Sequence, residues 1–216
     1  MWTTESYQLV TGLILGFCTV LAACNTKPVA YETITLHHDL GELHIRESAF
    51  FDTLNQWTHE LDCDCCHLRK VRLGNTQFPV LLENGWKYSQ PDSMQQLTIS
   101  QPDKASCDTS FQVDYQEIQV QRKYIRGQYF QDPLWVYSKI ETVDGFDFLV
   151  LGWEIEQYQR YNDQNLQQLL AITLIDGEKV TLDFNCRRQD CGNFLRRSFW
   201  LLQHMKIRPA KPKVSR

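Results

Sequence analysis

The sequence lacks several features that would place it in a specialised class of protein. The apolar stretch at residues 9–23 has only 15 residues, whereas a transmembrane helix needs roughly 20. Glycine (10 residues) and proline (7 residues) are too scarce for a low-complexity or collagen-like chain. The formal net charge of −4 provides no basic excess for binding nucleic acid. With 216 residues, of which 43% are hydrophobic and 12% aromatic, the chain instead has the composition of one globular domain with a sizeable core.

Motifs of common catalytic sites are also missing. The sequence contains no G-x-S-x-G nucleophile elbow, no phosphate-binding P-loop, no G-x-G-x-x-G fingerprint, no H-E-x-x-H zinc motif and no EF-hand loop. Nothing in the order of its Ser, His and Asp residues suggests a catalytic triad. The sequence therefore names no reaction, and we expect a protein that is not an enzyme.

The N-terminal stretch indicates export. Residues 9–23 have the length of the apolar region of a secretory signal and end in small residues. They lead into Leu21-Ala22-Ala23-Cys24, which resembles the lipobox of bacterial lipoproteins. One departure is that Met1 to Gln8 contains Glu5 and no Lys or Arg, whereas such signals usually begin with basic residues. A start codon further upstream would explain this.

The lipobox resemblance implies removal of residues 1–23 as a signal peptide and acylation of Cys24, followed by a tether at residues 24–30. Stable anchoring takes two or three acyl chains, at about 0.8 kcal/mol per buried methylene. Asn25, rather than Asp, after the cysteine favours a periplasm-facing position on the outer membrane. The alternative is an uncleaved N-terminal anchor or a buried helix of a cytosolic protein.

Cysteine content fits an oxidising compartment. Cys18 lies in the signal and Cys24 takes the lipid, which leaves an even number of cysteines. Cys186 and Cys191 flank a short polar turn and are close enough in sequence to pair locally. We expect at least one further bridge to join the cluster around residue 65 to Cys107. The six disulfide candidates are Cys63, Cys65, Cys66, Cys107, Cys186 and Cys191.

The same cluster supports an alternative based on metal or thiol chemistry. Thiolates and imidazoles suit zinc or copper, although structural zinc sites usually present two well-spaced pairs. Cys63 and Cys66 also form a C-x-x-C pair, but a thioredoxin-like pair begins a helix that follows a strand. The alternative ligands are His59, Cys63, Cys65, Cys66 and His67.

Hydrophobic periodicity predicts an α+β fold, an antiparallel sheet of about six strands flanked by two helices and tied by disulfides. Residues 33–45 predict a hairpin that turns at Asp39-Leu40-Gly41. Its histidines His37, His38 and His44 are expected to be exposed or packed rather than to form a site. A helix is expected after Ser48, because Phe50, Leu54, Trp57 and Leu61 follow helical spacing.

The remainder of the chain reads mainly as β-structure. Asp144-Gly145 and Asp176-Gly177 each predict a type I′ hairpin turn. A second helix is expected over 191–205, with Leu195, Phe199 and Leu202 buried and Arg196 and Arg197 on its solvated side. One domain would then cover 31–207, followed by a flexible basic tail at 208–216. The other expected strands are 68–73, 78–82, 95–100, 111–120 and 134–142.

The C-terminal third resembles PsbP-like and DcrB-like domains. The resemblance rests on residues 176–186, which read DGEKVTLDFNC, and on Phe194 to Ile207. It extends loosely over VDGFDFLVLGWEI and back to Leu82-Glu83-Asn84-Gly85-Trp86. Such domains are antiparallel sheets sandwiched by helices, and many occur in exported lipoproteins with adaptor-like roles. The resemblance implies a fold and no catalytic residue, and the hairpin, helix and cysteine cluster that precede it here are a departure.

The sequence thus predicts a lipid-anchored envelope lipoprotein that binds a protein or another envelope component. It predicts no cofactor and no nucleic acid partner. The alternative is a periplasmic metal-binding or thiol-redox protein that uses the cluster around Cys63.

Overall fold

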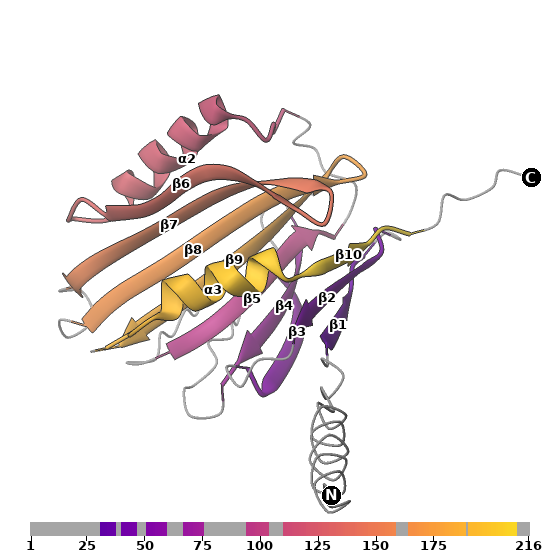
Figure 1. The fold of residues 1–216 in the computed structure, drawn as a ribbon, viewed down its shortest axis with the longest axis horizontal. Coiled ribbons are helices and arrows are strands. Elements are labelled where there is room, and N and C mark those ends of the chain that lie inside the picture. The colour runs from indigo at the N-terminus through magenta and orange to yellow at the C-terminus, as the bar shows by residue number, and fades with distance from the viewer. Residues whose placement is uncertain are drawn as a thin grey trace, which may run out of the picture. The chain divides into compact units, whose positions relative to one another are not determined.

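Two antiparallel sheets and two helices form the part of the chain that the computed structural model describes (Figure 1). The described residues are 31–37, 40–46, 51–59, 67–75, 94–103, 110–158, 164–188 and 190–210. All of them belong to the unit Tyr31–Arg216.

The larger sheet has seven strands in the order β3-β4-β5-β9-β8-β7-β6, and every neighbouring pair is antiparallel. Strands β3 and β6 are therefore its edges. The seven strands are β3 (Thr53–His59), β4 (Leu68–Gly74), β5 (Met94–Pro102), β6 (Leu134–Val143), β7 (Phe146–Tyr158), β8 (Gln164–Ile175) and β9 (Glu178–Arg188).

Two tight turns connect the longest strands of this sheet, as the sequence predicts. Asp144 and Gly145 link β6 to β7 with φ of 50° and 88°. Asp176 and Gly177 link β8 to β9 with φ of 50° and 82°. Positive φ at both central residues defines the type I′ turn, which matches the twist of the flanking strands.

The smaller sheet joins two distant segments of the chain. Strands β1 (Tyr31–Thr35) and β2 (Glu42–Arg46) form the predicted hairpin, and β10 (Lys206–Arg208) pairs with β2 on its other side. Gly41, with φ of 110°, lies against the backbone of Arg208, and a side chain at residue 41 would collide with it. The end of the domain is thus held against its beginning.

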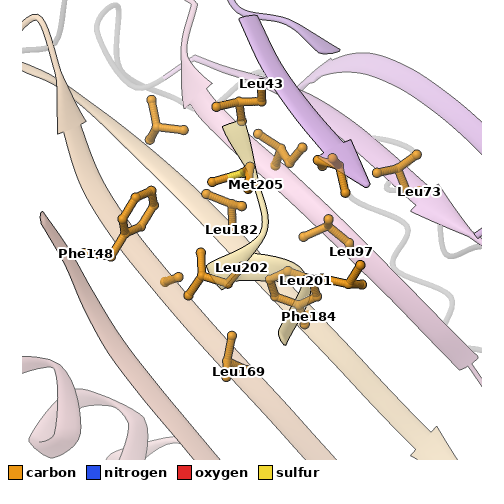
Figure 2. Close-up of a cluster of buried hydrophobic side chains, with 14 of the residues drawn as sticks. Leu43, Leu73, Leu97, Phe148, Leu169, Leu182, Phe184, Leu201, Leu202 and Met205 are labelled. Carbon is orange, nitrogen blue, oxygen red and sulfur yellow. The ribbon is translucent and has the colours of Figure 1, made fainter. Parts of the chain in front are cut away.

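The two helices lie on opposite faces of the larger sheet. Helix α3 (Phe194–Gln203) and the smaller sheet share one face, where a core forms between them and the large sheet. Figure 2 shows Leu201, Leu202 and Met205 against Leu182 and Phe184, with Leu43 of β2 close by. The predicted helix over 191–205 is confirmed, including burial of Leu195 and Leu202 and exposure of Arg196 and Arg197. Phe199, predicted to be buried, is only partly buried and stacks on Tyr137 of β6.

Helix α2 (Tyr115–Gly127) covers only β6, β7 and β8 on the other face (Figure 1). Its buried residues Ile118 and Ile125 contact a second core that includes Leu151 and Trp153 of β7. The strands β4, β5 and β9 lie beyond this helix, and their side chains on the same face are mostly polar. This contrast sets the position of the polar cluster described below.

Two elements differ from the sequence prediction, and the strand count is higher than six. Residues 53–59, predicted as part of a helix, form β3, in which Leu54 and Trp57, an odd number of residues apart, point to opposite faces. Every residue of β3 pairs with β4, which satisfies its backbone.

Residues 111–120, predicted as a strand, instead lead into α2. The apolar alternation of Phe111, Val113 and Tyr115 imitates strand periodicity. The side chain of Asp114 caps the helix, and Ile118 and Ile125 share its buried face. The predicted strand at 78–82 lies outside the described residues.

Candidate functional site

The histidines of the proposed cysteine cluster are brought to one end of a hairpin. His59 is the last residue of β3 and pairs with Leu68 of β4, so His67 lies one position beyond this pair. The Nδ1 atom of His67 is buried and has no hydrogen-bond partner in the described part of the chain. Cys63, Cys65 and Cys66 lie between the two histidines in sequence, outside the described residues, as does Cys107.

Within the described ranges, no group of three or more His, Cys, Asp or Glu side chains could hold a metal ion. Nor do these ranges contain a helix long and apolar enough to cross a membrane. Cys24 and the segments assigned to the signal and tether lie outside them.

A disulfide joins Cys186, at the end of β9, to Cys191, just before α3. Their Cα atoms are 6.0 Å apart, a usual separation for a disulfide. Both side chains are buried in the core beneath α3. The bridge therefore fixes the start of α3 against the sheet and has a structural role.

The histidines of the first hairpin do not converge on a site. His44 contacts Glu42 (Nε2 to Oε2, 3.1 Å) and Thr33 (Nδ1 to Oγ1, 3.2 Å). His37 instead lies beside Arg69 and Asp103, with 3.6 Å from its Nε2 to the Asp103 carboxylate. His38 lies outside the described residues.

A row of polar side chains crosses the centre of the large sheet on the α2 side. Register places Arg72 of β4 opposite Thr98 of β5, and Thr98 opposite Asp183 of β9. Arg72 Nε donates to Thr98 Oγ1 (2.9 Å), and its guanidinium lies 4.6 Å from the ring centre of Trp57. Gln168 Nε2 of β8 donates to Asp183 Oδ1 (2.7 Å). Five strands thus contribute to one polar cluster, which we call the sheet cluster (Trp57, Arg72, Thr98, Gln168 and Asp183).

Asp183 is the electrostatically unusual member of the sheet cluster. Burial disfavours the charged carboxylate and raises its pKa to about 6. The hydrogen bond from Gln168 and the charges of Arg72 and Lys70 act in the opposite direction. Although its side chain is only half-buried by surface area, the surrounding protein decides its charge state. The carboxyl therefore titrates near neutral pH.

Helix α2 presents a second distinctive feature, a cationic flank beside β6. Gln119, Arg122, Lys123 and Arg126 occupy positions i, i+3, i+4 and i+7 and line a cleft of about 180 Å³. The Arg122 guanidinium lies 4.7 Å from the ring centre of Trp135 in β6. Arg126 Nε forms an ion pair with Asp132 (3.0 Å), which precedes β6. These contacts direct the flank towards the edge of the sheet.

Exposed apolar side chains accumulate around the same helix. Of the nine large apolar residues exposed in the described part of the chain, six fall within residues 115–136. Tyr124 is 66% exposed and Phe130 is 97% exposed. We call the exposed face formed by Tyr115, Gln119, Val120, Arg122, Lys123, Tyr124, Arg126 and Phe130 the α2 surface.

Sequence reasoning missed both features. The α2 surface does not emerge from the sequence because the pattern of residues 111–120 predicts a strand. Two signals favour a helix instead: Asp114 is followed three residues later by Glu117, and Ile118 and Ile125 lie seven residues apart. The contacts of the sheet cluster join residues that lie on different strands and far apart along the chain, 15 positions for Gln168–Asp183 and 26 for Arg72–Thr98. No local sequence pattern predicts such a cluster.

Comparison with known proteins yields similarity of fold alone. No family model and no curated protein matches the chain. Among solved structures, cyanobacterial PsbP (CyanoP) from Synechocystis sp. PCC 6803 is 11% identical, with a TM-score of 0.49, over 88% of this chain and 99% of the other. PA94 from Pseudomonas aeruginosa, a protein of unknown function, is 9% identical, with a TM-score of 0.40, over 83% of this chain and 99% of the other. Neither likeness bears on function.

Proposed function

We propose that the protein is an exported lipoprotein, anchored through Cys24, whose single α+β domain binds a partner without catalysing a reaction. The motif Leu21-Ala22-Ala23-Cys24 supports the anchor. The disulfide between Cys186 and Cys191 is in keeping with an oxidising compartment. Asn25 favours the outer membrane, with the domain facing the periplasm.

The α2 surface is the observation that carries the binding role. Aromatic residues and arginine are enriched in the cores of protein interfaces, and contiguous exposed apolar patches mark interaction sites. Here tyrosine, phenylalanine and arginine occur together on one exposed helix and the segment that follows it. Binding surfaces of this kind need no catalytic group, in agreement with the missing catalytic motifs.

Anchoring is tested by comparing Cys24→Ala with Cys18→Ala, a matched change in the same apolar stretch. Wild type and Cys18→Ala should lose residues 1–23, gain the mass of acyl chains and partition into detergent. Cys24→Ala should keep its full length and carry no acyl chain. Intact mass spectrometry decides the matter, and an unacylated wild type would refute the anchor.

A second candidate function is metal binding or thiol chemistry at the cysteine cluster. The observation in its favour is that β3 and β4 bring His59 and His67 to the same end of a hairpin, on either side of Cys63, Cys65 and Cys66 in sequence. Neutral imidazole nitrogens and thiolates together are suitable ligands for zinc or copper.

Native mass spectrometry and thiol counting separate the two candidates. The binding lipoprotein requires the six cysteines that follow Cys24 to be oxidised, so that denaturing reduction adds about 6 Da, two hydrogens for each of three bridges. Bound zinc or copper would instead favour the metal site, provided that the double variant His59→Ala with His67→Ala no longer binds the metal. Free thiols without metal would favour redox chemistry.

A further inference from the structure

The α2 surface carries charge of the opposite sign to the rest of the domain. Arg122, Lys123 and Arg126 lie on it, while the one acid within α2, Glu117, accepts a hydrogen bond from Gln121 on the other flank (2.7 Å). The whole chain carries −4. Leaving out the basic tail 208–216, with four basic residues and no acid, and the signal residue Glu5 gives about −7 for the remainder. Cations gathered on one helix of an acidic body attract an acidic partner.

Apolar residues on the same surface indicate that the partner also supplies apolar contacts. Tyr115, Val120 and Tyr124 are each more than half exposed on α2, with Tyr115 on the cationic flank, and the exposed Phe130 lies three residues beyond the end of the helix. Side chains of this size bury large areas when a partner covers them. A purely electrostatic contact would leave them in water.

The position of α2 disfavours the anchoring membrane as the partner. Residues 25–30 can span at most about 20 Å when extended, and they lead to Tyr31 of β1. Strand β1 packs on the same face of the large sheet as α3, whereas α2 lies on the opposite face. Packed layers are about 10 Å thick, so the large sheet separates α2 from β1 by roughly two layers.

We propose that the α2 surface binds an acidic peptide segment of a partner protein, with its carboxylates in the cleft lined by Gln119, Arg122, Lys123 and Arg126. Apolar residues of the segment would cover Tyr115, which lies on the same flank as Gln119 and Arg122, and Phe130. The proposal deepens the binding role given above, and only the argument from orientation rests on the lipid anchor.

The test uses the full-length chain in phosphatidylcholine nanodiscs and a fluorescein-labelled peptide of roughly 12 residues in Glu-Glu-Tyr repeats. A peptide with Lys in place of Glu serves as the control ligand. We expect the acidic peptide to bind in an anisotropy titration, with an affinity that falls as salt is added. Lys123→Glu with Arg126→Glu should weaken binding about tenfold or more, because two attractions become repulsions.

Arg196→Glu with Arg197→Glu is the matched control, since it reverses two exposed cations on α3. It should leave binding of the acidic peptide unchanged. Equal binding to both double variants, equal binding of the lysine peptide, or no binding would overturn the proposal.

A second arm distinguishes a membrane surface from a protein. Adding phosphatidylglycerol to the nanodiscs should leave hydrogen exchange in α2 unchanged, whereas the acidic peptide should slow it. Protection of α2 by the anionic lipid would show that the surface binds membrane and would overturn the proposal. Acylation of Cys24 is read separately by mass, so failure of the anchor is distinguishable from failure of the peptide site.

Discussion

Asp183 shows how strongly one residue can depend on its neighbours along a strand face. Its position in β9 alternates with the buried Leu182 and Phe184, so the sequence alone places it on the side opposite the main core. Cross-strand pairing then sets it opposite Thr98, near the guanidinium of Arg72. The sequence pattern predicts that the Asp183 carboxylate faces solvent, but cross-strand pairing places protein groups around it.

Replacing Asp183 by Asn tests this electrostatic environment. Since its pKa is about 6 in the folded protein and 3.8 without the fold, the folded state binds the proton more tightly. Asp183 therefore lowers stability as pH rises through 4 to 6, and the loss is complete above pH 6. Asp183→Asn, which keeps an oxygen for Gln168, should be more stable than wild type at pH 7.5 by on the order of 2 kcal/mol.

The measurement is urea unfolding of both proteins between pH 4 and pH 7.5. The difference between them should shrink towards zero at the acidic end. A variant that is less stable than wild type at pH 7.5 would mean that the charged carboxylate stabilises the fold through Arg72.

At the scale of elements, α2 depends on local signals that its alternating apolar residues obscure. Asp114 Oδ1 accepts a hydrogen bond from the backbone N–H of Glu117 (2.7 Å). Such a cap satisfies a donor that has no partner within the helix.

Asp114→Ala should destabilise the protein by about 1 kcal/mol, because the N-cap acceptor is lost. Asp114→Asn keeps the acceptor and is the matched control, expected to stay close to wild type. Urea unfolding gives the free energies, and hydrogen exchange should show faster opening confined to the first turn of α2. Equal destabilisation by Ala and Asn would assign the effect to the charge of Asp114 instead.

Elements with strong local chemistry could be predicted from the sequence. Asp144-Gly145 and Asp176-Gly177 determine their turns because both central residues must adopt positive φ. Helix α3 follows from its apolar stripe, and the spacing of Cys186 and Cys191 matches the observed disulfide.

The sequence prediction is wrong where a short apolar pattern fits both the helical period of 3.6 residues and the strand period of two. Leu54 and Trp57 satisfy helical spacing, yet β3 forms because β4 offers it a complete set of backbone partners. Phe111, Val113 and Tyr115 satisfy strand spacing, yet capping and the burial of Ile118 and Ile125 produce a helix. The α2 surface could not be predicted before this helix was recognised, and the sheet cluster depends on register across five strands.

At the scale of the whole molecule, the chain closes on itself. Strand β10, near the end of the domain, pairs with β2, near its beginning. The carboxylate of Asp144 accepts a hydrogen bond from the backbone N–H of Ile207 (2.7 Å), which lowers its pKa and connects β10 to the β6–β7 turn. One core extends from the smaller sheet through α3 to the large sheet (Figure 2). We therefore expect the smaller sheet and the large sheet to unfold together.

Leu43→Ala in β2 tests this cooperativity. Leu43 is fully buried in the shared core, and removing such a side chain costs about 2–5 kcal/mol. If the core is one cooperative unit, hydrogen exchange should show the same shift in urea midpoint for β7 and β8 of the large sheet and for β1 and β2 of the smaller sheet. Leu54→Ala, at a residue that is 40% exposed on β3, is the matched control and should cost less than about 1 kcal/mol. Two separate transitions, with β1 and β2 exchanging at lower urea than the large sheet unfolds, would show that closure by β10 does not couple the sheets.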